Sequence, residues 1–434
     1  MLGGALSFAG PIDGVALFGY AAIACLLLGA IALIPWLVRG LLDKLPPPAS
    51  PVGILAVEQL RGSPGQAMVS LAAIVASFSL MVAMAIMVAS FRQSVADWLD
   101  TVLPADLYFR SSQAGDTAYL EPDFARAVRS LPGVARVDLL RSGRLVLDAA
   151  RPAVSLIARD LPAGDGGRVF PGVGARYERH AGDPPPAWVS EAMVELYGWS
   201  PGRRIELPLA GASREFVVAG VWRDYARQQG AVLIDRKDYV ALTGDERVND
   251  GSIWLAAGST SGASLLQTID ALRRLPGGAQ LDIAPPGEIR RSSLAIFDRS
   301  FAVTYAIEAV AVLVGLFGLS SSLGAIVLAR RREFGMLRHL GMTRASIGAM
   351  LAAEGGLLAA LGATAGLATG AAISLVLIHV VDRQSFNWSI DLHAPWATLA
   401  LLTGLLVLLA AATAWLAGRE AMGAGPVRAV REDW

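Results

Sequence analysis

The chain has 434 residues, of which 54% are hydrophobic and only 17% are charged. This excess of apolar residues is too large for an ordinary soluble domain and is typical of a membrane protein. The formal net charge is zero, so no overall field favours nucleic acid as a partner. Cys25 is the only cysteine, which excludes a disulfide within one chain and a cysteine-based metal site.

Five uncharged apolar runs predict membrane-spanning helices. Each exceeds the roughly 20 residues that a helix needs to cross a hydrocarbon core about 30 Å thick. The runs cover residues 14–38, 66–91, 309–329, 355–381 and 394–418, and the third helix is expected to begin near residue 300. We therefore expect a polytopic α-helical membrane protein with five transmembrane helices. The first residues lack a basic segment and a cleavage pattern, so no cleaved signal peptide is expected.

The basic residues of the short loops predict the orientation. Residues 39–65, 330–344 and 419–434 together hold eleven arginines and lysines, whereas residues 1–13 hold none and residues 382–393 hold one. Because short cytoplasmic loops are enriched in these residues, the first three segments are expected inside. This orientation places the amino terminus and the long insert after the second span outside, and the carboxyl terminus inside.

The amino-terminal part is expected to contain a leading span in residues 1–45, a cytoplasmic linker in 46–65 and the second span in 66–91. The linker starts with a proline-rich stretch that cannot continue a helix. A short amphipathic helix then follows, and it would lie along the cytoplasmic membrane face. Its apolar residues are Val52, Leu55, Val57 and Leu60.

Residues 92–299 form a large extracytoplasmic insert between the second and third spans, and about 200 residues are enough for a folded domain. Short β-branched segments bounded by Gly, Pro or Asp, with a few helical patterns between them, predict an α+β domain. The middle of the insert, residues 160–187, is rich in Gly, Pro and Arg and is expected to be loop or a flexible subdomain. The expected strands are 106–110, 134–140, 144–147, 154–158, 204–209, 215–222, 231–234 and 253–255, and the expected helices are 121–130, 190–197 and 264–275.

The last part of the chain, residues 300–434, is expected to be a second membrane domain. It comprises a third span at 300–329, a basic loop at 330–350, a fourth span at 351–381, a fifth span at 394–418 and a cytoplasmic tail.

The basic loop has its own pattern, RRREFGMLRHLGMTR, between residues 330 and 344. Phe334, Leu337 and Leu340 recur every three residues and predict an apolar ridge on a short helix. Gly341 is placed to end this helix, and Thr343 is placed to cap the next one. Two interpretations stay open: a basic loop that only sets the topology, or a helix that docks into a partner with an apolar groove and an acidic rim.

Two carboxylates, Glu308 and Glu354, lie within or near spans, where an ionisable group suggests a functional site. The alternative is placement near the interface, where both side chains would reach headgroups or water. Gly362, Gly366 and Gly370 form a small-residue face that permits close helix approach. That face is explained either by packing within the chain or by contact between two membrane modules.

No pattern of catalytic or metal-binding residues is recognisable. The four histidines, which are His180, His339, His379 and His393, are scattered without the spacing of a metal site. The phosphate-binding sequence GxxxxGK[ST] is absent, so this chain is not expected to be an ATPase or to hold a cofactor.

The run RRREFGMLRHLGMTRASIGAMLAAEG resembles the cytoplasmic coupling segment of FtsX-like ABC transporter permeases, the MacB-type class of mechanotransmission (type VII) transporters. In that family an Arg–Glu pair is followed by an apolar residue, a Leu–Arg pair, a glycine turn and a further basic residue. Glu354 stands where the next span of such permeases usually starts with Glu. The matching residues of this coupling loop are Arg331, Arg332, Glu333, Met336, Leu337, Arg338, Gly341 and Arg344.

The resemblance extends over roughly residues 52–434. The leading span at 14–38 exceeds the four spans of a simple permease and resembles the second half of a long, ten-span permease. The further matching segments are 60–65, 90–92, 98–99, 131–134, 216–224, 232–235 and 425–431.

The resemblance implies a multi-pass permease subunit of the bacterial cytoplasmic (inner) membrane. A separate ABC ATPase dimer, which binds the ATP and magnesium, would dock on residues 330–344 and move the extracytoplasmic domain. That movement would export or extract a lipid, lipoprotein or peptide-like substrate. The further partners implied are a second permease half or a second copy, membrane lipids, and a periplasmic adaptor or substrate-binding protein.

Two other classes of function stay open. In one, the same movement activates an external cell-wall hydrolase or signals to a sensor kinase. In the other, the chain is a membrane-anchored enzyme with its active site in the outer domain, although no cluster of acid and base residues supports this.

Overall fold

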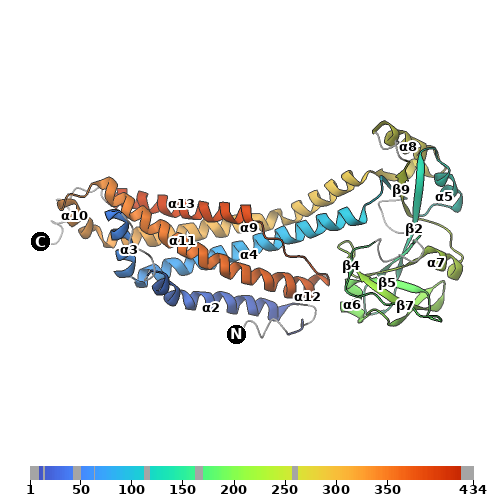
Figure 1. Cartoon of the computed structure of the whole chain (residues 1–434), viewed down its shortest axis with the longest axis horizontal. Coiled ribbons are helices and arrows are strands. Elements are labelled where there is room, and N and C mark those ends of the chain that lie inside the picture. The colour runs from blue at the N-terminus through green and yellow to red at the C-terminus, as the bar shows by residue number, and fades with distance from the viewer. Residues whose placement is uncertain are drawn as a thin grey trace. The chain divides into compact units, whose positions relative to one another are not determined.

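The computed structural model describes residues 9–12, 15–42, 50–62, 64–111, 118–161, 170–256 and 262–421. The chain divides into two compact units. The helical unit comprises Met1–Phe91, Arg299–Ser385 and Asp391–Trp434, and the sheet unit comprises Arg92–Asp298 and the short segment Phe386–Ile390. Figure 1 labels many of the elements of both units.

Long apolar helices build the helical unit (Figure 1). Uncharged runs rich in Ala, Leu, Ile and Val form these helices because a helix satisfies every backbone polar group within one segment. A single π-helical turn, Leu377–Val381, interrupts the regular winding between α11 and α12. The helices are α2 (Leu17–Leu42), α3 (Pro51–Gly62), α4 (Pro64–Val102), α9 (Pro286–Ala329), α10 (Arg331–His339), α11 (Arg344–Val376), α12 (Asp382–Phe386) and α13 (Trp396–Ala421).

Four stretches of the described residues are long and apolar enough to cross a membrane, namely Leu17–Trp36, Met68–Val102, Arg344–Phe386 and Trp396–Arg419. They correspond to four of the five expected spans. The expected third span, residues 300–329, lies in α9, but several of its side chains are outside the described set, so this span stays a prediction.

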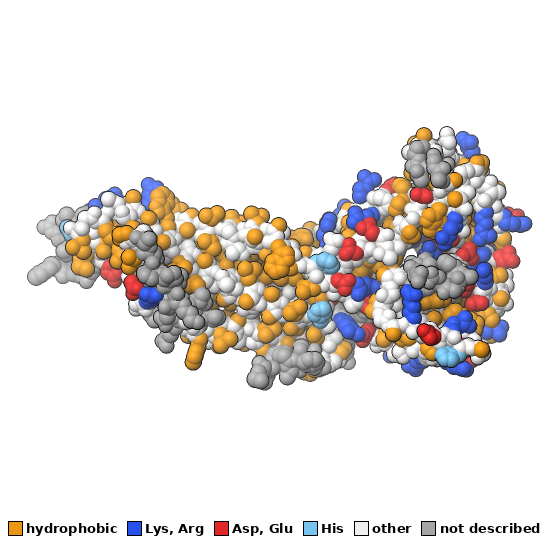
Figure 2. Space-filling model, in the orientation of Figure 1, with side chains coloured by type: hydrophobic (Ala, Val, Ile, Leu, Met, Phe, Trp, Pro, Cys, Tyr) orange, Lys and Arg blue, Asp and Glu red, His pale blue; other side chains and the backbone are white. Residues whose placement is uncertain are grey.

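The surface of the helical unit supports membrane insertion. Large apolar side chains are exposed on its helices, including Trp36 at 82%, Leu401 at 70% and Leu408 at 69%. Figure 2 shows hydrophobic side chains over this face and charged side chains gathered on the sheet unit. An exposed apolar surface of this extent is unusual for a soluble protein and suits contact with lipid.

Two helices are longer than hydropathy predicts. Helix α4 continues eleven residues beyond the boundary between the units, and α9 begins at Pro286 rather than near residue 300. Within the sheet unit, Arg92 Nε lies 2.9 Å from Asp298 Oδ1, and Arg290 Nε lies 2.9 Å from Asp100 Oδ1. These two ion pairs join the extensions of α4 and α9.

The sheet unit contains one mixed sheet of ten strands among the described residues. The strand order is β10-β1-β9-β2-β3-β8-β5-β7-β4, with β6 paired to β7. Neighbours are antiparallel except for β3 with β8 and β5 with β7, which are parallel. The strands are β1 (Leu107–Arg110), β2 (Val134–Leu145), β3 (Val154–Arg159), β4 (Gly172–Val173), β5 (Pro186–Ser190), β6 (Arg204–Leu209), β7 (Ala212–Trp222), β8 (Ala231–Asp235), β9 (Asp250–Leu255) and β10 (Asp282–Ala284).

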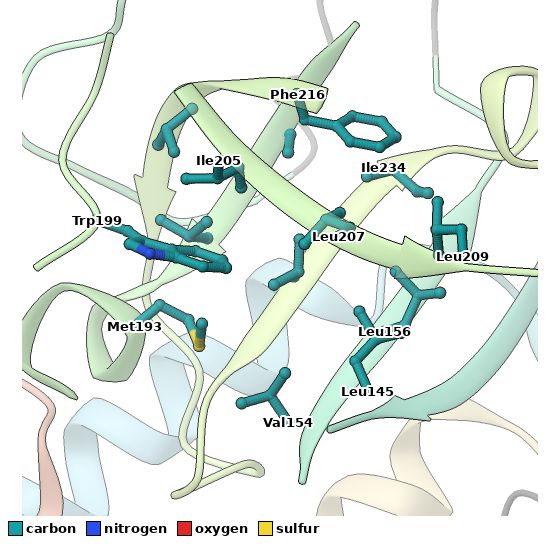
Figure 3. Close-up of a cluster of buried hydrophobic side chains, with 14 of the residues drawn as sticks. Leu145, Val154, Leu156, Met193, Trp199, Ile205, Leu207, Leu209, Phe216 and Ile234 are labelled. Atoms are coloured by element: carbon teal, nitrogen blue, oxygen red, sulfur yellow. The ribbon is translucent and has the colours of Figure 1, made fainter. Parts of the chain in front are cut away.

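Four short helices accompany the sheet in the described part of this unit, namely α5 (Pro122–Arg129), α6 (Glu191–Tyr197), α7 (Arg236–Thr243) and α8 (Gly262–Arg274). One apolar core lies against β1, β2 and β9, and a second lies against β3 and β5 to β8. In the second core, Ile205, Leu207 and Leu209 alternate with exposed residues along β6, because successive side chains of a strand point to opposite faces. Figure 3 shows these three with Met193, Trp199 and Phe216.

The expectation of loop for residues 160–187 is wrong in part. Residues 162–169 lie outside the described residues, but β4 lies within the stretch and β5 begins at Pro186. Strand β5 pairs with both β7 and β8, so the end of this stretch contributes the first two residues of an interior strand of the sheet.

Candidate functional site

The turn that joins α9 to α11 contains the basic loop and its short helix, α10. Gly341 ends α10 with a φ of +99°, a backbone conformation that favours glycine. Its N–H donates to the Arg338 carbonyl at 3.1 Å, and the Met342 N–H donates to the Leu337 carbonyl at 3.0 Å. This pair of hydrogen bonds is a Schellman motif, and it confirms the predicted helix stop.

The next helix begins with a side-chain cap. Thr343 Oγ1 accepts a hydrogen bond from the Ser346 N–H at 3.1 Å. This interaction satisfies one of the free N–H groups in the first turn of α11 and confirms the predicted cap. Both ends of the turn between α10 and α11 are therefore determined locally.

The predicted apolar ridge on α10 is wrong in its first member. Phe334 is only 2% exposed and packs in the interior of the helical unit, whereas Leu337 and Arg338 are half-buried. Met336 and Leu340, four residues apart and hence on one face, are 66% and 81% exposed. The apolar surface that α10 offers to a partner therefore centres on Met336 and Leu340.

A buried ion pair holds α10 against α11. Arg330 Nη1 lies 3.4 Å from Glu354 Oε1 and 3.3 Å from Oε2, and the two side chains are only 10% and 7% exposed. Arg330 Nε also donates to Glu333 Oε2 at 3.0 Å, and the guanidinium lies 5.4 Å from the centre of the Phe334 ring. Arg330 therefore connects the end of α9 to both following helices.

This geometry corrects the expectation for Glu354. The carboxylate does not reach headgroups or water but is buried against Arg330. The side chain of Glu308 lies outside the described set, as do the side chains of Arg331 and Arg332. Of the remaining expected coupling residues, Glu333 joins the Arg330 pair and Arg344 is exposed at the start of α11.

Arg330 is the residue that sequence reasoning missed. The sequence contained one indication of its role, because a carboxylate such as Glu354 within or near a span usually pairs with a cationic side chain. Among the described residues, no group of three His, Cys, Asp or Glu side chains is placed to hold a metal ion.

Helix α3, the expected amphipathic helix, packs against α11. Val57 and Leu60 of its expected apolar face are buried, but Leu55 is 39% exposed. Arg61 and Glu58 form an exposed pair at 2.6 Å on the outer side of this helix. The apolar face of α3 is therefore shared between the protein interior and its surroundings.

The glycine face of α11 packs within the chain. A Cβ at Gly362 would lie 2.7 Å from the Ile74 side chain, and one at Gly370 would lie 2.7 Å from the Ser79 carbonyl oxygen. Helix α4 therefore occupies this face. The alternative, that these glycines form the contact between two membrane modules, is wrong for this face.

Residues 305–426 match the family model of the FtsX-like permease C-terminal domain. An uncharacterized ABC transporter permease of Mycobacterium tuberculosis is 30% identical over 411 residues, which cover 90% of this chain and 47% of the relative. An uncharacterized ABC transporter permease of Methanocaldococcus jannaschii is 20% identical over 226 residues, which cover 51% of this chain and 56% of the relative. The chain thus spans about half the length of these curated relatives.

Two solved structures are similar to the chain at low identity. The periplasmic region of MacB from Actinobacillus actinomycetemcomitans is 14% identical with a TM-score of 0.33, covering 45% of this chain and 94% of that region. The extracellular domain of the noncanonic ABC-type transporter YknZ from Gram-positive bacteria is 15% identical with a TM-score of 0.28, covering 42% and 98%. The family match over residues 305–426 and the related permeases together identify the chain as a homologue of ABC transporter permeases that carries an FtsX-like permease C-terminal domain.

Proposed function

We propose that the chain is the membrane subunit of an ABC transporter and that a separate ATPase dimer docks on α10. The observation that carries this proposal is the exposed pair Met336 and Leu340 on a helix that the buried Arg330–Glu354 pair holds in place. An exposed apolar anchor on a rigid helix suits insertion into an apolar groove of a partner. The expected arginines around it would contact an acidic rim.

The rest of the proposal concerns coupling and placement. The α10 turn lies in the cytoplasm, the sheet unit lies outside, and the helical unit crosses the inner membrane several times. Closure of the ATPase dimer moves α10, and the buried ion pair passes the movement to α11. The sheet unit then acts at the outer surface on a lipid, lipoprotein or peptide-like substrate, together with a second permease half or a second copy of this chain.

Substitution of both exposed residues tests the docking site. The Met336→Glu/Leu340→Glu variant is expected to reduce co-purification of the ATPase from native membranes by at least tenfold, because two carboxylates would have to be buried without partners. The measurement is ATP hydrolysis by the purified complex, together with mass spectrometry of the bound subunit.

A matched control is Leu266→Glu, since Leu266 is 64% exposed on α8 of the sheet unit. This control is expected to retain the ATPase at the wild-type level. Unchanged ATPase recovery with the double variant, in a chain that still inserts into the membrane, would exclude α10 as the docking site. A separate measurement addresses the substrate: lipids or proteins that co-purify with a nucleotide-trapped complex of the wild type would identify its class.

A further inference from the structure

The short segment Phe386–Ile390 has an unusual place in the chain. It begins at the last residue of α12 and precedes α13, and both helices belong chiefly to the helical unit, yet its own contacts assign it to the sheet unit. We propose that this segment is a tether, docked in a dedicated site of the sheet unit, that attaches α11 and α13 to the β5–β7 side of the sheet. The role of this tether in transmitting movement rests on the function proposed above.

The polar half of the docking site surrounds Ser389. The Ser389 N–H donates to Glu191 Oε2 at 3.1 Å, and Ser389 Oγ donates to Glu191 Oε1 at 2.6 Å. Arg223 Nη2 donates to Ser389 Oγ at 2.8 Å, and Tyr225 Oη donates to the Ser389 carbonyl oxygen at 2.8 Å. One residue of the tether therefore has its N–H, hydroxyl and carbonyl all bound by the sheet unit.

The charges of the site are complementary and largely shielded from water. Arg223 Nε lies 3.7 Å from Glu191 Oε2, and the two side chains are 20% and 12% exposed. Hydrogen bonds in which one partner is charged are stronger than those between neutral groups. The hydrogen bonds that join Ser389 to Glu191 and Arg223 are therefore the strongest contacts of the tether.

The apolar half of the site is aromatic. Trp388 is 4% exposed, and its ring makes an edge contact with Tyr225 at 5.6 Å and stacks on Phe386 at 5.5 Å. Trp98 of α4 contacts the Tyr225 ring at 5.9 Å, and its Nε1 donates to the Arg223 carbonyl at 3.0 Å. Tyr225 is therefore the point at which the tether and the α4 extension meet.

The backbone of the tether is shaped for this site. Asn387 has a φ of +59°, in the left-handed region that asparagine tolerates better than most residues. This turn lies directly before Trp388 and Ser389, which make the contacts. Ile390, the last tether residue, is only 4% exposed.

The tether is a third connection of the sheet unit to the helices, after the connections through α4 and α9. The strand order explains why it matters. Helix α4 leads into β1, and β10 leads into α9, and these two strands are neighbours at one end of the sheet. The tether binds Glu191 directly after β5 and Arg223 directly after β7, which lie toward the other end. The covalent attachments and the tether therefore hold different ends of one sheet, so a movement between them would bend the sheet unit.

Hydrogen–deuterium exchange of the full chain in detergent tests the docking. The Glu191→Ala variant is expected to speed exchange of the Ser389 amide at least tenfold, because its acceptor is lost. Tyr225→Phe keeps the ring contacts and removes one hydrogen bond, so a smaller increase is expected.

The matched control is Glu206→Ala, which removes another Glu–Ser hydrogen bond, 2.7 Å from Ser213 Oγ, elsewhere in the sheet unit. This control is expected to leave exchange of residues 386–390 unchanged. Wild-type exchange of the Ser389 amide in the Glu191→Ala variant would overturn the docked tether.

A second measurement tests transmission in the complex with the ATPase. Addition of a non-hydrolysable ATP analogue is expected to change the hydrogen–deuterium exchange of the β5–β7 peptides in the wild type. The Glu191→Ala/Ser389→Ala variant is expected to lose this response but still to hydrolyse ATP. An equal response in that variant would overturn the role in transmission. If the wild type shows no nucleotide response anywhere, the proposed function fails, and the docking measurement alone decides whether the tether exists.

Discussion

At the scale of single residues, the Arg330–Glu354 pair carries the largest expected effect on stability. Removal of one partner from a buried pair leaves an uncompensated charge, which costs about 3–5 kcal/mol. Glu354→Leu is therefore expected to lower the free energy of unfolding of the full chain in detergent by about this amount. The Arg330→Met/Glu354→Leu variant is expected to recover most of the loss, since two apolar side chains leave no unpaired charge.

The exposed pair Arg61–Glu58 provides the comparison, because its side chains are 30% and 58% exposed. Glu58→Leu is expected to change the stability by less than about 1 kcal/mol, as surface pairs do. If Glu354→Leu were as mild as Glu58→Leu in the same denaturation experiment, the Arg330 pair would have no structural role.

A second residue-scale prediction concerns pH and the sheet unit. Burial raises the pKa of Asp245, but the hydrogen bond from Arg247 Nε at 2.7 Å and the contact with Arg141 at 3.1 Å outweigh burial and lower the pKa from 3.8 to about 2. Because the folded pKa is depressed, the stabilisation is present above about pH 4 and is lost as the pH falls toward 2. Asp245→Asn is therefore expected to lower the melting temperature at pH 7 and to have a smaller effect at pH 3.

Thermal unfolding of both proteins at several pH values measures this difference. A penalty for Asp245→Asn that stayed constant from pH 7 to pH 3 would show that the carboxylate charge is not what stabilises the site.

The predictability of the site differs from residue to residue. The stop at Gly341 and the cap at Thr343 depend on neighbouring residues, so sequence reasoning found both. The pairing of Arg330 with Glu354 depends on how the end of α9 packs on α11, 24 residues later in the chain. Nothing in the local pattern determines that packing, and nothing local indicates that Phe334 is buried.

At the scale of elements, the close packing of α11 on α4 predicts that an added methyl group at their contact destabilises the chain. Gly370→Ala is expected to destabilise the chain by about 1–3 kcal/mol, because the new Cβ would lie 2.7 Å from the Ser79 carbonyl oxygen and 2.7 Å from Val82 Cβ. Gly404→Ala in α13 is the matched control, since no atom lies within 4 Å of its Cβ position. Equal melting temperatures for the two variants would contradict the close contact between α11 and α4.

Strand prediction succeeded for short β-branched segments bounded by Gly, Pro or Asp, such as β6, which has one buried and one exposed face, and β8, which is almost entirely buried. The alternation in Arg204–Leu209 predicted β6 with its observed bounds. Strand β5 was missed because a run of prolines leads into it and none of its five residues is exposed, so it has no polar face to mark it. Helix α7 has no buried residue to produce a period, and the extensions of α4 and α9 carry charges that ended the hydropathy signal too early.

At the scale of the whole molecule, the proposed topology predicts which segments a protease reaches. Trypsin added to intact spheroplasts is expected to cleave near the exposed Arg179 in the sheet unit and to spare residues 330–344. Both regions are expected to be cleaved after permeabilisation, because Arg344 is also exposed on the protein surface. Cleavage of the α10 turn in intact spheroplasts would reverse the orientation.

The proposed tether would also limit how far the β5–β7 side of the sheet can move away from the start of α13. His393 is held to α4, since its N–H donates to Ser90 Oγ at 2.9 Å and Ser90 Oγ donates to its carbonyl at 3.1 Å. Only three peptide steps separate it from Ile390, so the chain between them reaches about 11 Å at full extension. Because both of its ends are held, this segment sets a maximum distance between them. Inserting a few residues into it would allow a larger displacement and would transmit less force.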